Sequence, residues 1–268
     1  SFQPVHLASL RIIIGALILL IFSLLLKKNL FSGKKPMTYW LACLGVALLS
    51  NTLPFILLAV AQEHLSSVFV GLCMATIPLI ILLLAHFLLS NEQISIKKMF
   101  GIILGVCGTG LLISSQSGMT ENPSSLTKTF YIWLCILAPF CYASGAIIIR
   151  KLGPTDFLEF STHSLLIACL ICMPVLIFFG DSPLNVSYQA ISAILYLGIF
   201  STGIATIILV LIIKNEGAVF VSLVNFKVPF WSTVFGVFFL NEVLPNNFSA
   251  SFSLILTGIL ICQLEKAK

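Results

Sequence analysis

Long runs of apolar residues, separated by short polar stretches, dominate the hydropathy pattern of this chain of 268 residues. A helix that crosses a bilayer needs about 20 mostly apolar residues, and strands are much shorter than that. Runs of this length predict an all-α polytopic membrane protein. The nine expected helices span residues 4–26, 37–61, 65–89, 98–114, 129–150, 157–179, 188–213, 218–240 and 248–264.

Composition supports a surface that faces lipid. Hydrophobic residues make up 59% of the chain and charged residues only 9%, whereas soluble domains carry about 25% charged residues. The net charge of +5 is modest, and its residues are spread over short loops. Nucleic-acid binding would need them gathered on one face, so we expect a lipid bilayer and no nucleic acid as partner.

A three-part motif occurs twice along the chain, each time as a Pro-containing apolar helix, an Asn-Glu turn and a short helix with a Gly. The prolines lie 229 − 78 = 151 residues apart, and the glycines 258 − 108 = 150 residues apart. Such a duplication in an apolar chain points to a transporter built from two repeats. We expect a first repeat over 1–114 with four helices, an external linker over 115–128, and a second repeat over 129–268 with five. The two copies are Pro78, Asn91–Glu92, Gly108 and Pro229, Asn241–Glu242, Gly258.

Basic residues in the connections predict the orientation. Alternate connections and the C-terminus hold 11 of the 14 Lys and Arg residues, whereas the opposite side holds only Lys128. Lys and Arg concentrate on the cytoplasmic side, so the C-terminus is expected in the cytoplasm and Ser1 outside. The two repeats are then inverted relative to each other. Nine helices with Ser1 outside also predict a tenth helix upstream, the missing leading helix of the first repeat.

Residues spread over nearly the whole chain carry a resemblance to a known family. In the first half they are Pro4, Arg11, Pro78, Glu92, Gly101 and Gly108. In the second they are Asn225-Phe226-Lys227-Val228-Pro229, Gly236, Leu240-Asn241-Glu242 and Gly258, with Gly198 and Gly217 spaced by 19 residues. This pattern resembles the EamA domains of the drug/metabolite transporter superfamily. The resemblance implies a ten-helix inverted-repeat carrier of the bacterial inner membrane, with a central cavity and alternating access. It favours export of amino-acid-like metabolites, although import and exchange fit the same fold.

Pro78 and Pro229 are the first candidates for lining a cavity. Proline lacks an N–H and clashes with the carbonyl four residues earlier, so it kinks a helix and frees an acceptor, which in lipid must face protein or a polar cavity. Both lie near the expected middle of the bilayer, and the alternative is that each only bends its helix for packing. At similar depth Asn51, Thr52, Thr76, Asn225, Ser201 and Thr202 could donate or accept hydrogen bonds, and Trp231 and Phe226 could form an apolar wall.

Lys227 is the sharpest single candidate, two residues before Pro229 and at a position where the family usually has an apolar residue. A charge at the centre of a membrane helix costs about 2.5–3.5 kcal/mol on insertion scales. Lys227 either faces a cavity and meets a carboxylate-bearing substrate, or pairs with a structural partner such as Asn225, Glu159 or a helix-end carbonyl.

Three further residues are candidates for coupling or gating. Glu159 and His163 are four residues apart on one expected helix face, near its cytoplasmic end. They either form a protonatable pair for proton coupling, or their polar groups are simply satisfied by hydrogen bonds at the membrane interface. Arg11 lies about 10 Å into its helix at 1.5 Å per residue. It is either a gating residue or an anchor that reaches outer headgroups.

Other residue groups favour structural roles. Glu92 and Glu242 are expected as turn residues near the positive ends of the following helices, with Asn as the cap. Tyr39 and several other aromatic residues near helix ends read as interfacial. Gly101, Gly105 and Gly108 form a small-residue face for close packing, with a homodimer as one use of it. Cys169 and Cys172 lack companion ligands, so we expect no metal and no cofactor.

A secondary transporter of a small organic metabolite, amino-acid-like or otherwise carboxylate-bearing, is the function that these observations predict. No phosphate-binding loop of the G-x-x-x-x-G-K-[ST] type is present, so ATP is not an expected partner. A channel or facilitator is the alternative, because inverted repeats also form channels. A scaffold or a membrane-embedded enzyme fits less well, since no catalytic constellation is evident at one depth, and we expect no enzyme.

Overall fold

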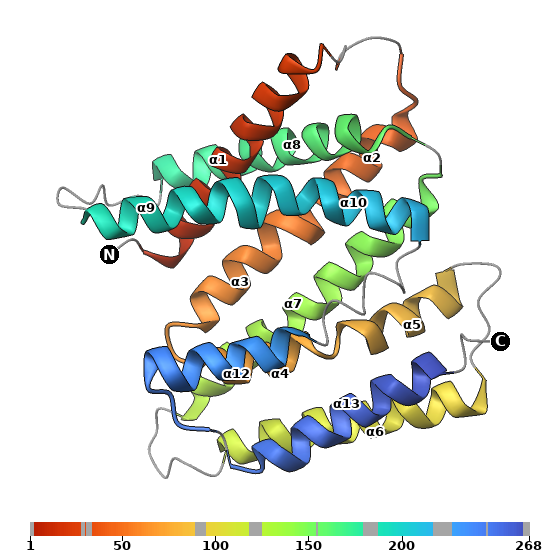
Figure 1. Cartoon of the computed structure of the whole chain (residues 1–268), viewed down its shortest axis with the longest axis vertical. Helices are drawn as coiled ribbons and strands as arrows, with labels where there is room; N and C mark the ends of the chain where they lie inside the picture. Colours follow the sequence, from red (N-terminus) through yellow and green to blue (C-terminus); the bar gives the residue numbers. More distant parts are fainter. Residues whose placement is uncertain are drawn as a thin grey trace. The chain divides into compact units, whose positions relative to one another are not determined.

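The computed structural model describes residues 3–27, 30, 34–88, 95–117, 125–153, 155–178, 187–216, 227–244 and 246–264. Within these ranges the regular structure is helical and contains no strand (Figure 1). Each of the nine expected segments contains helix, which confirms the predicted all-α polytopic membrane protein. Stretches long and apolar enough to cross a membrane are Pro4–Leu25, Met37–Ala61, Ser67–Leu88, Thr129–Lys151, Phe157–Pro174 and Tyr188–Glu216.

The chain divides into two compact units, and the first combines Ser1–Ala59 with Ser144–Ala218. In this unit α1 packs against α8 and against a π-helical segment, η2. Ile12, Ala16 and Leu19 of α1 are fully buried there, because they repeat at a spacing that places them on one helix face. Its elements are α1 (Pro4–Leu25), α2 (Met37–Val46), η1 (Ala47–Thr52), most of α3 (Leu53–Ala61), the end of α7 (Ser125–Lys151), α8 (Phe157–Phe178), α9 (Tyr188–Tyr196), η2 (Leu197–Ile204) and α10 (Ala205–Glu216).

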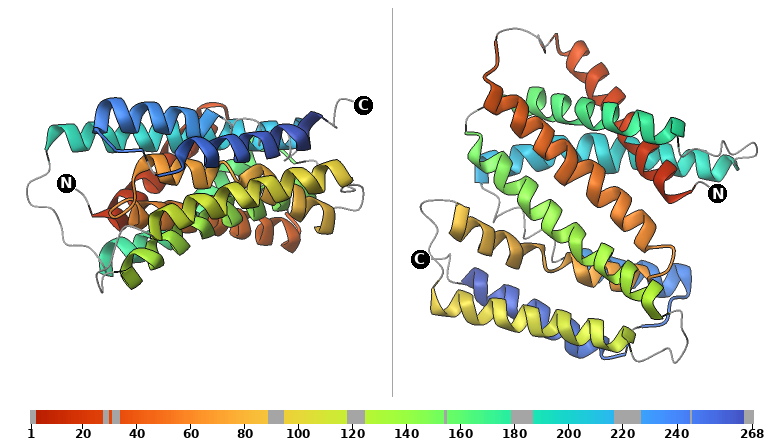
Figure 2. Two further views of the ribbon diagram at one scale, coloured as in Figure 1. Left: turned by 90° about the horizontal axis from the view of Figure 1, so that it is seen from below. Right: turned by 180° about the vertical axis from the view of Figure 1, so that it is seen from behind.

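The second unit combines Val60–Ala143 with Val219–Lys268. Here α12 packs against α4, and α13 packs against α6. The helices α6 and α13 run in opposite directions (Figures 1 and 2), as an inverted repeat requires of the helices that carry Gly108 and Gly258. Its elements are α4 (Ser67–Met74), α5 (Ile77–Leu88), α6 (Ile96–Ser117), the first part of α7, α12 (Lys227–Leu240) and α13 (Phe248–Leu264).

Each compact unit therefore takes helices from both halves of the chain. The sequence repeat divides the chain near its middle, whereas the packing interleaves the two halves. The repeat boundaries at 114 and 129 stay a prediction from the sequence.

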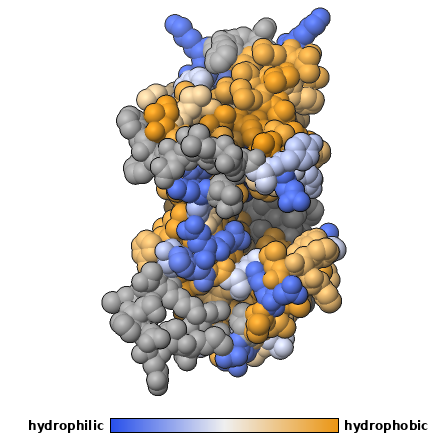
Figure 3. Space-filling view, turned by 90° about the vertical axis from the view of Figure 1, so that its left-hand side faces the viewer, coloured by the Kyte–Doolittle hydropathy of each residue, from blue (hydrophilic) through white to orange (hydrophobic). Residues whose placement is uncertain are grey.

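Large apolar side chains cover much of the outer surface, as expected of helices that face lipid. Figure 3 shows one face on which they gather in broad patches. Phe238 is 77% exposed and Leu25 is 74% exposed. Exposure of these side chains to water would cost about 25 cal/mol per Å² of apolar area. Contact with lipid acyl chains avoids this cost.

One of the predicted continuous helices is interrupted by a turn within the described residues. The segment expected over 65–89 breaks at Ala75–Thr76, where a turn separates α4 from α5. Pro78 lies in the first turn of α5 and is buried, where proline is tolerated because its missing N–H has no helical partner. The helix is thus broken by a turn just before Pro78 and not kinked within a continuous run, and the cavity-lining role of Pro78 stays a prediction. The residues before Lys227 lie outside the described ranges, so the equivalent kink at Pro229 stays a prediction.

Candidate functional site

Two helices of the first unit widen into π-helical turns. The segments η1 and η2 begin at Ala47 and Leu197, which are 197 − 47 = 150 residues apart, the spacing of the sequence repeat. π-Helical turns are rare and occur frequently at functional sites. At η1 the cause is Pro54, which would clash with the carbonyl of Ser50 in a regular helix. A wider turn relieves that clash.

At η2 the cause is the close passage of α1. At the glycine positions of this crossing there is no room even for a methyl group. A Cβ on Gly198 would contact Ile14, and a Cβ on Gly15 would lie 3.1 Å from the Gly198 carbonyl oxygen. A second glycine, Gly203, lies at the far end of η2 and packs against Leu19. The glycines let the backbones of α1 and η2 approach, and this crossing positions the polar residues of both.

The π-helical segments carry four of the residues that the sequence proposed for a cavity. Thr202 is buried and its hydroxyl donates to the Leu197 carbonyl oxygen at 3.0 Å. Asn51 is buried too, and its Nδ2 donates to the Val46 carbonyl oxygen at 3.3 Å. Thr52 is buried beside the thiol of Cys172, whereas Ser201 is exposed. Three of these four residues thus serve the packing of their own unit.

Arg11 reaches this site from α1. Its Nε donates to Thr202 Oγ1 at 3.1 Å, and its Cζ lies 3.9 Å from the centroid of the Phe55 ring. The guanidinium therefore meets a hydroxyl of η2 and the face of an aromatic ring of α3, a favourable cation–π geometry. The interpretation of Arg11 as an anchor to outer headgroups does not describe this side chain, because it is directed at neighbouring helices.

In the second unit Thr76 lies at the break before Pro78. Its hydroxyl donates to the Cys73 carbonyl oxygen at 2.6 Å, so it takes up an acceptor at the interrupted end of α4. Thr76 also lines a cavity of about 300 Å³ whose walls are mostly aliphatic residues of α5 and α6. Pro78 is buried and is not part of that wall.

The remaining candidates of the second unit lie on or before α12. Lys227 is exposed at the first residue of α12, and Asn225 and Phe226 lie outside the described residues. The depth of Lys227 and its choice of partner therefore stay predictions. Pro229 is buried, and its carbonyl oxygen accepts from Thr233 Oγ1 at 2.7 Å. Trp231 is 50% exposed and stacks on Phe235.

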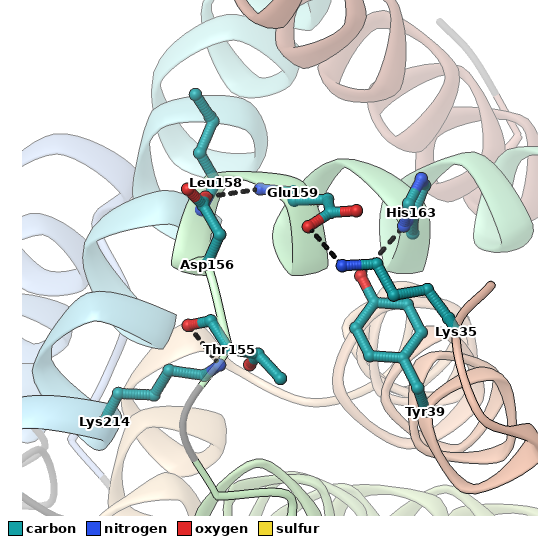
Figure 4. A network of polar contacts seen from close by, with 8 residues as sticks. All are labelled: Lys35, Tyr39, Thr155, Asp156, Leu158, Glu159, His163 and Lys214. Atoms are coloured by element: carbon teal, nitrogen blue, oxygen red, sulfur yellow. Dashed lines mark hydrogen bonds and ion pairs between the residues drawn. The ribbon is translucent and has the colours of Figure 1, made fainter. Parts of the chain in front are cut away.

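At one end of the first unit, Glu159 and His163 take separate partners (Figure 4). Glu159 Oε2 accepts from Lys35 Nζ at 2.7 Å. His163 Nδ1 forms a hydrogen bond with the Tyr39 hydroxyl at 2.8 Å. Both side chains thus form hydrogen bonds with α2 or with a residue before it, and a role of Glu159 and His163 in coupling stays a prediction. The prediction that Tyr39 is interfacial was wrong: it is 2% exposed and packs on Phe160.

The same end of the unit joins three connections of the chain. Lys214, near the end of α10, donates to the Thr155 carbonyl oxygen at 2.9 Å. Asp156 Oδ1 accepts from the backbone N–H groups of Leu158 and Glu159 and thereby caps α8. The distribution of basic residues predicts that the connection before α2, the connection between α7 and α8, and the connection after α10 lie on one side of the membrane. In the first unit, residues of these three connections lie together.

Glu242 caps a helix, but a different one from the helix that the sequence suggested. Its Oε1 accepts from the backbone N–H of Ser67 at 2.9 Å and its Oε2 from that of Val68 at 3.1 Å, at the beginning of α4. Asn241 has a φ of 54° just after α12, so it ends that helix and does not cap the next. Glu92 lies outside the described residues.

The expected glycine face of α6 is used within the chain. A Cβ on Gly258 of α13 would meet the backbone of Gly101 and Gly105, and one on Gly108 would meet Leu254 and Ile255 of α13. This packing satisfies the predicted close contact without a second copy, and a homodimer stays a prediction. Cys169 and Cys172 belong to the core of the first unit. Among the described residues no group of three His, Cys, Asp or Glu side chains could hold a metal ion.

Long apolar helices and exposed apolar side chains define a polytopic membrane protein. A model of the EamA-like transporter family matches residues 1–114 and 129–263. The chain belongs to the EamA-like transporter family.

Relatives in two bacteria are similar over most of their length. The uncharacterized transporter YdfC of Bacillus subtilis (strain 168) is 26% identical over 91% of this chain and 76% of that protein. The uncharacterized transporter YoaV of the same organism is 23% identical over 97% and 85%. Protein PecM of Dickeya dadantii (strain 3937) is 28% identical over 78% and 69%.

A solved crystal structure has a similar fold. It superposes with a TM-score of 0.72 over 98% of this chain and 88% of that one, at 18% sequence identity. At this identity the likeness concerns the fold alone.

Proposed function

We propose that this chain is a secondary carrier that moves a small carboxylate-bearing solute, such as an amino-acid-like metabolite, across the bacterial inner membrane by alternating access. Family membership supports transport, and two of the relatives, YdfC and YoaV, are named as transporters. Basic connections that meet at one end of the first unit support a cytoplasmic location of that end. For the C-terminus, the support is the distribution of Lys and Arg along the sequence.

The observation that carries the proposal for substrate class is the hydrogen bond from Arg11 Nε to Thr202 Oγ1. It fixes a permanently charged, planar guanidinium inside a membrane-spanning helix, and ionisable residues at such positions mark substrate or ion pathways. A guanidinium fork matches a carboxylate in a bidentate geometry. Arg11 is partly exposed, so its charge is within reach of a solute.

The π-helical turns supply the mobility that alternating access needs. A π-helical turn departs from the regular α-helical hydrogen-bond ladder, and a return to that ladder would shift the residues of the segment. Because Thr202 lies in η2, such a shift would move the hydroxyl that orients Arg11. In the second unit Lys227 and the buried prolines stay candidates for solute contact.

The test is uptake into vesicles that contain the purified protein, with a panel of amino acids and other carboxylates, with and without a pH gradient. Saturable uptake and counter-exchange are expected of a carrier, whereas flux that never saturates would establish a channel and reject the proposal.

A matched pair of variants at Thr202 and one variant at Arg11 connect uptake to the site. Thr202→Val removes the hydroxyl and keeps the shape, whereas Thr202→Ser keeps the hydroxyl. A hydrogen bond to a charged group contributes about 1.5–3 kcal/mol, so Thr202→Val should weaken apparent affinity by roughly 10–100-fold and Thr202→Ser should stay close to the parent. Arg11→Gln should lower the apparent affinity for carboxylates more than the apparent affinity for the corresponding amides. Equal losses for both would exclude Arg11 as the carboxylate contact.

A further inference from the structure

A second, separate cavity lies at the end of the first unit, where α7 and α10 end and α8 begins. Its volume is about 410 Å³, enough for a phosphorylated headgroup. The residues that line it are Ile149, Arg150, Gly153, Thr155, Phe157, Lys214 and Asn215. Gly153 has a φ of 74°, a left-handed conformation that favours glycine and lets the chain turn tightly after α7.

Two cationic side chains, from α7 and α10, line this cavity. Arg150 Nη1 donates to the backbone carbonyl oxygen of Lys214 at 3.5 Å, so its guanidinium lies against the residue that carries the second charge. Lys214 Nζ is held by the Thr155 carbonyl oxygen and lies 5.3 Å from the Phe160 ring centroid. Because both residues line the cavity, an anion inside it would be attracted by two positive charges.

The acidic residues around Lys214 are not part of the cavity wall. Asp156 caps the beginning of α8, and Glu159 pairs with Lys35. No acidic residue is among the described residues that line the cavity. The Thr155 hydroxyl oxygen is buried and has no hydrogen-bond partner among the described residues, so the wall contains an unused polar group next to the two cations.

We propose that this cavity binds a phosphate group. Arg150 and Lys214 approach from different helices and could each meet a different oxygen of a tetrahedral anion. Phe157, 37% exposed, adds an apolar surface for the glycerol part of a phospholipid. The cavity lies at the end that the basic residues assign to the cytoplasm, and basic pockets between membrane helices on that side bind anionic lipid headgroups. A soluble phosphate ester has the same chemistry.

The experiment measures binding to the purified chain in detergent micelles. Phosphatidylglycerol is compared with phosphatidylcholine of the same acyl chains, and sn-glycerol 1-phosphate serves as the soluble ester. Arg150→Gln is compared with Lys151→Gln, which removes the same charge at an exposed neighbouring residue outside the cavity wall. We expect Arg150→Gln to weaken binding at least fivefold, Lys151→Gln to change it less than twofold, and Arg150→Lys to restore part of it.

Either phosphate source supports the proposal when its binding depends on Arg150 and not on Lys151. Preference for phosphatidylglycerol over the soluble ester identifies a lipid site, and the opposite preference identifies a site for a soluble phosphate. The thermal unfolding temperature without ligand separates lost binding from lost folding, and Lys214→Gln provides a second test of the wall. Absence of binding by both probes, or equal binding by the Gln variants at 150 and 151, overturns the proposal.

Discussion

Glu242 joins the end of one helix to the beginning of another that lies 175 residues earlier in the chain. The first N–H groups of α4 have no partner within their own helix, and a carboxylate satisfies them while it complements the positive end of the helix dipole. Ser67 adds a third bond, from its hydroxyl to Glu242 Oε1 at 2.6 Å. One side chain thus holds α4 against the end of α12.

Glu242→Gln should lower the free energy of unfolding by about 1–3 kcal/mol, because an amide nitrogen cannot accept from an N–H and the remaining bonds lose their charge. Thermal unfolding in detergent measures the change. Glu63→Gln, at an exposed acidic residue close to α4, is the control and should shift the transition little. Equal effects of the two substitutions would mean that Glu242 is not a structural cap.

For single residues, the sequence predicted which side chains are important better than it predicted what those side chains contact. Arg11 and Glu242 stood out because charges are rare in this chain, and Glu242 was expected at a helix beginning. The helix it caps and the Thr202 hydroxyl that Arg11 meets depend on how distant segments pack, which residue spacing does not reveal. The prediction for Tyr39 was wrong for the same reason. An aromatic residue near a helix end is typical of the membrane interface, and the sequence does not show that His163 of a distant helix buries this one.

Between elements, the contact of α6 with α13 depends on Gly258. The Cβ that Ala would add there has backbone atoms of Gly101 and Gly105 in its way, and backbone cannot rotate aside as a flexible side chain can. Overpacking of this kind costs about 1–3 kcal/mol.

Gly258→Ala should therefore destabilise the protein by that amount in thermal or denaturant unfolding. Gly110→Ala is the matched control on α6, since nothing lies within 4 Å of its Cβ position. It should be neutral or stabilising by up to about 1 kcal/mol through better helix propensity. A Gly258→Ala variant as stable as Gly110→Ala would show that the two helices separate easily.

The positions of the helices were predictable because apolar length alone determines them, within a few residues at each end. The expected helix over 98–114, for example, extends as α6 over Ile96–Ser117. The π-helical turns were not predicted. Pro54 and Gly198 mark their locations, but proline and glycine in membrane helices are accommodated in several ways. Which of these ways occurs depends on how the neighbouring helices pack, as α1 does against η2.

For the whole molecule, the orientation in the membrane is the prediction with the sharpest test. In a cysteine-free background, single cysteines replace exposed residues at the two expected sides: Lys34 and Lys151 on one, Glu63 and Tyr188 on the other. A membrane-impermeant maleimide added to intact cells should label the cysteines at 63 and 188, and those at 34 and 151 only after permeabilisation. Labelling in the reverse order would invert the topology and place the phosphate-binding cavity outside.

The interleaving of the two halves also determines when the protein can assemble during its synthesis. The first unit needs residues up to 218 as well as residues 1–59, so α1 and η1 must wait in the bilayer until η2 and α10 emerge. At about 5–20 residues per second this interval lasts roughly 8–30 s. During this interval Thr202 has not yet been synthesised, so α1 must be inserted into the membrane while the Arg11 guanidinium lacks this hydrogen-bond acceptor. Slow elongation or an insertion factor that shelters α1 should therefore influence the yield of this protein more than that of a carrier whose halves fold one after the other.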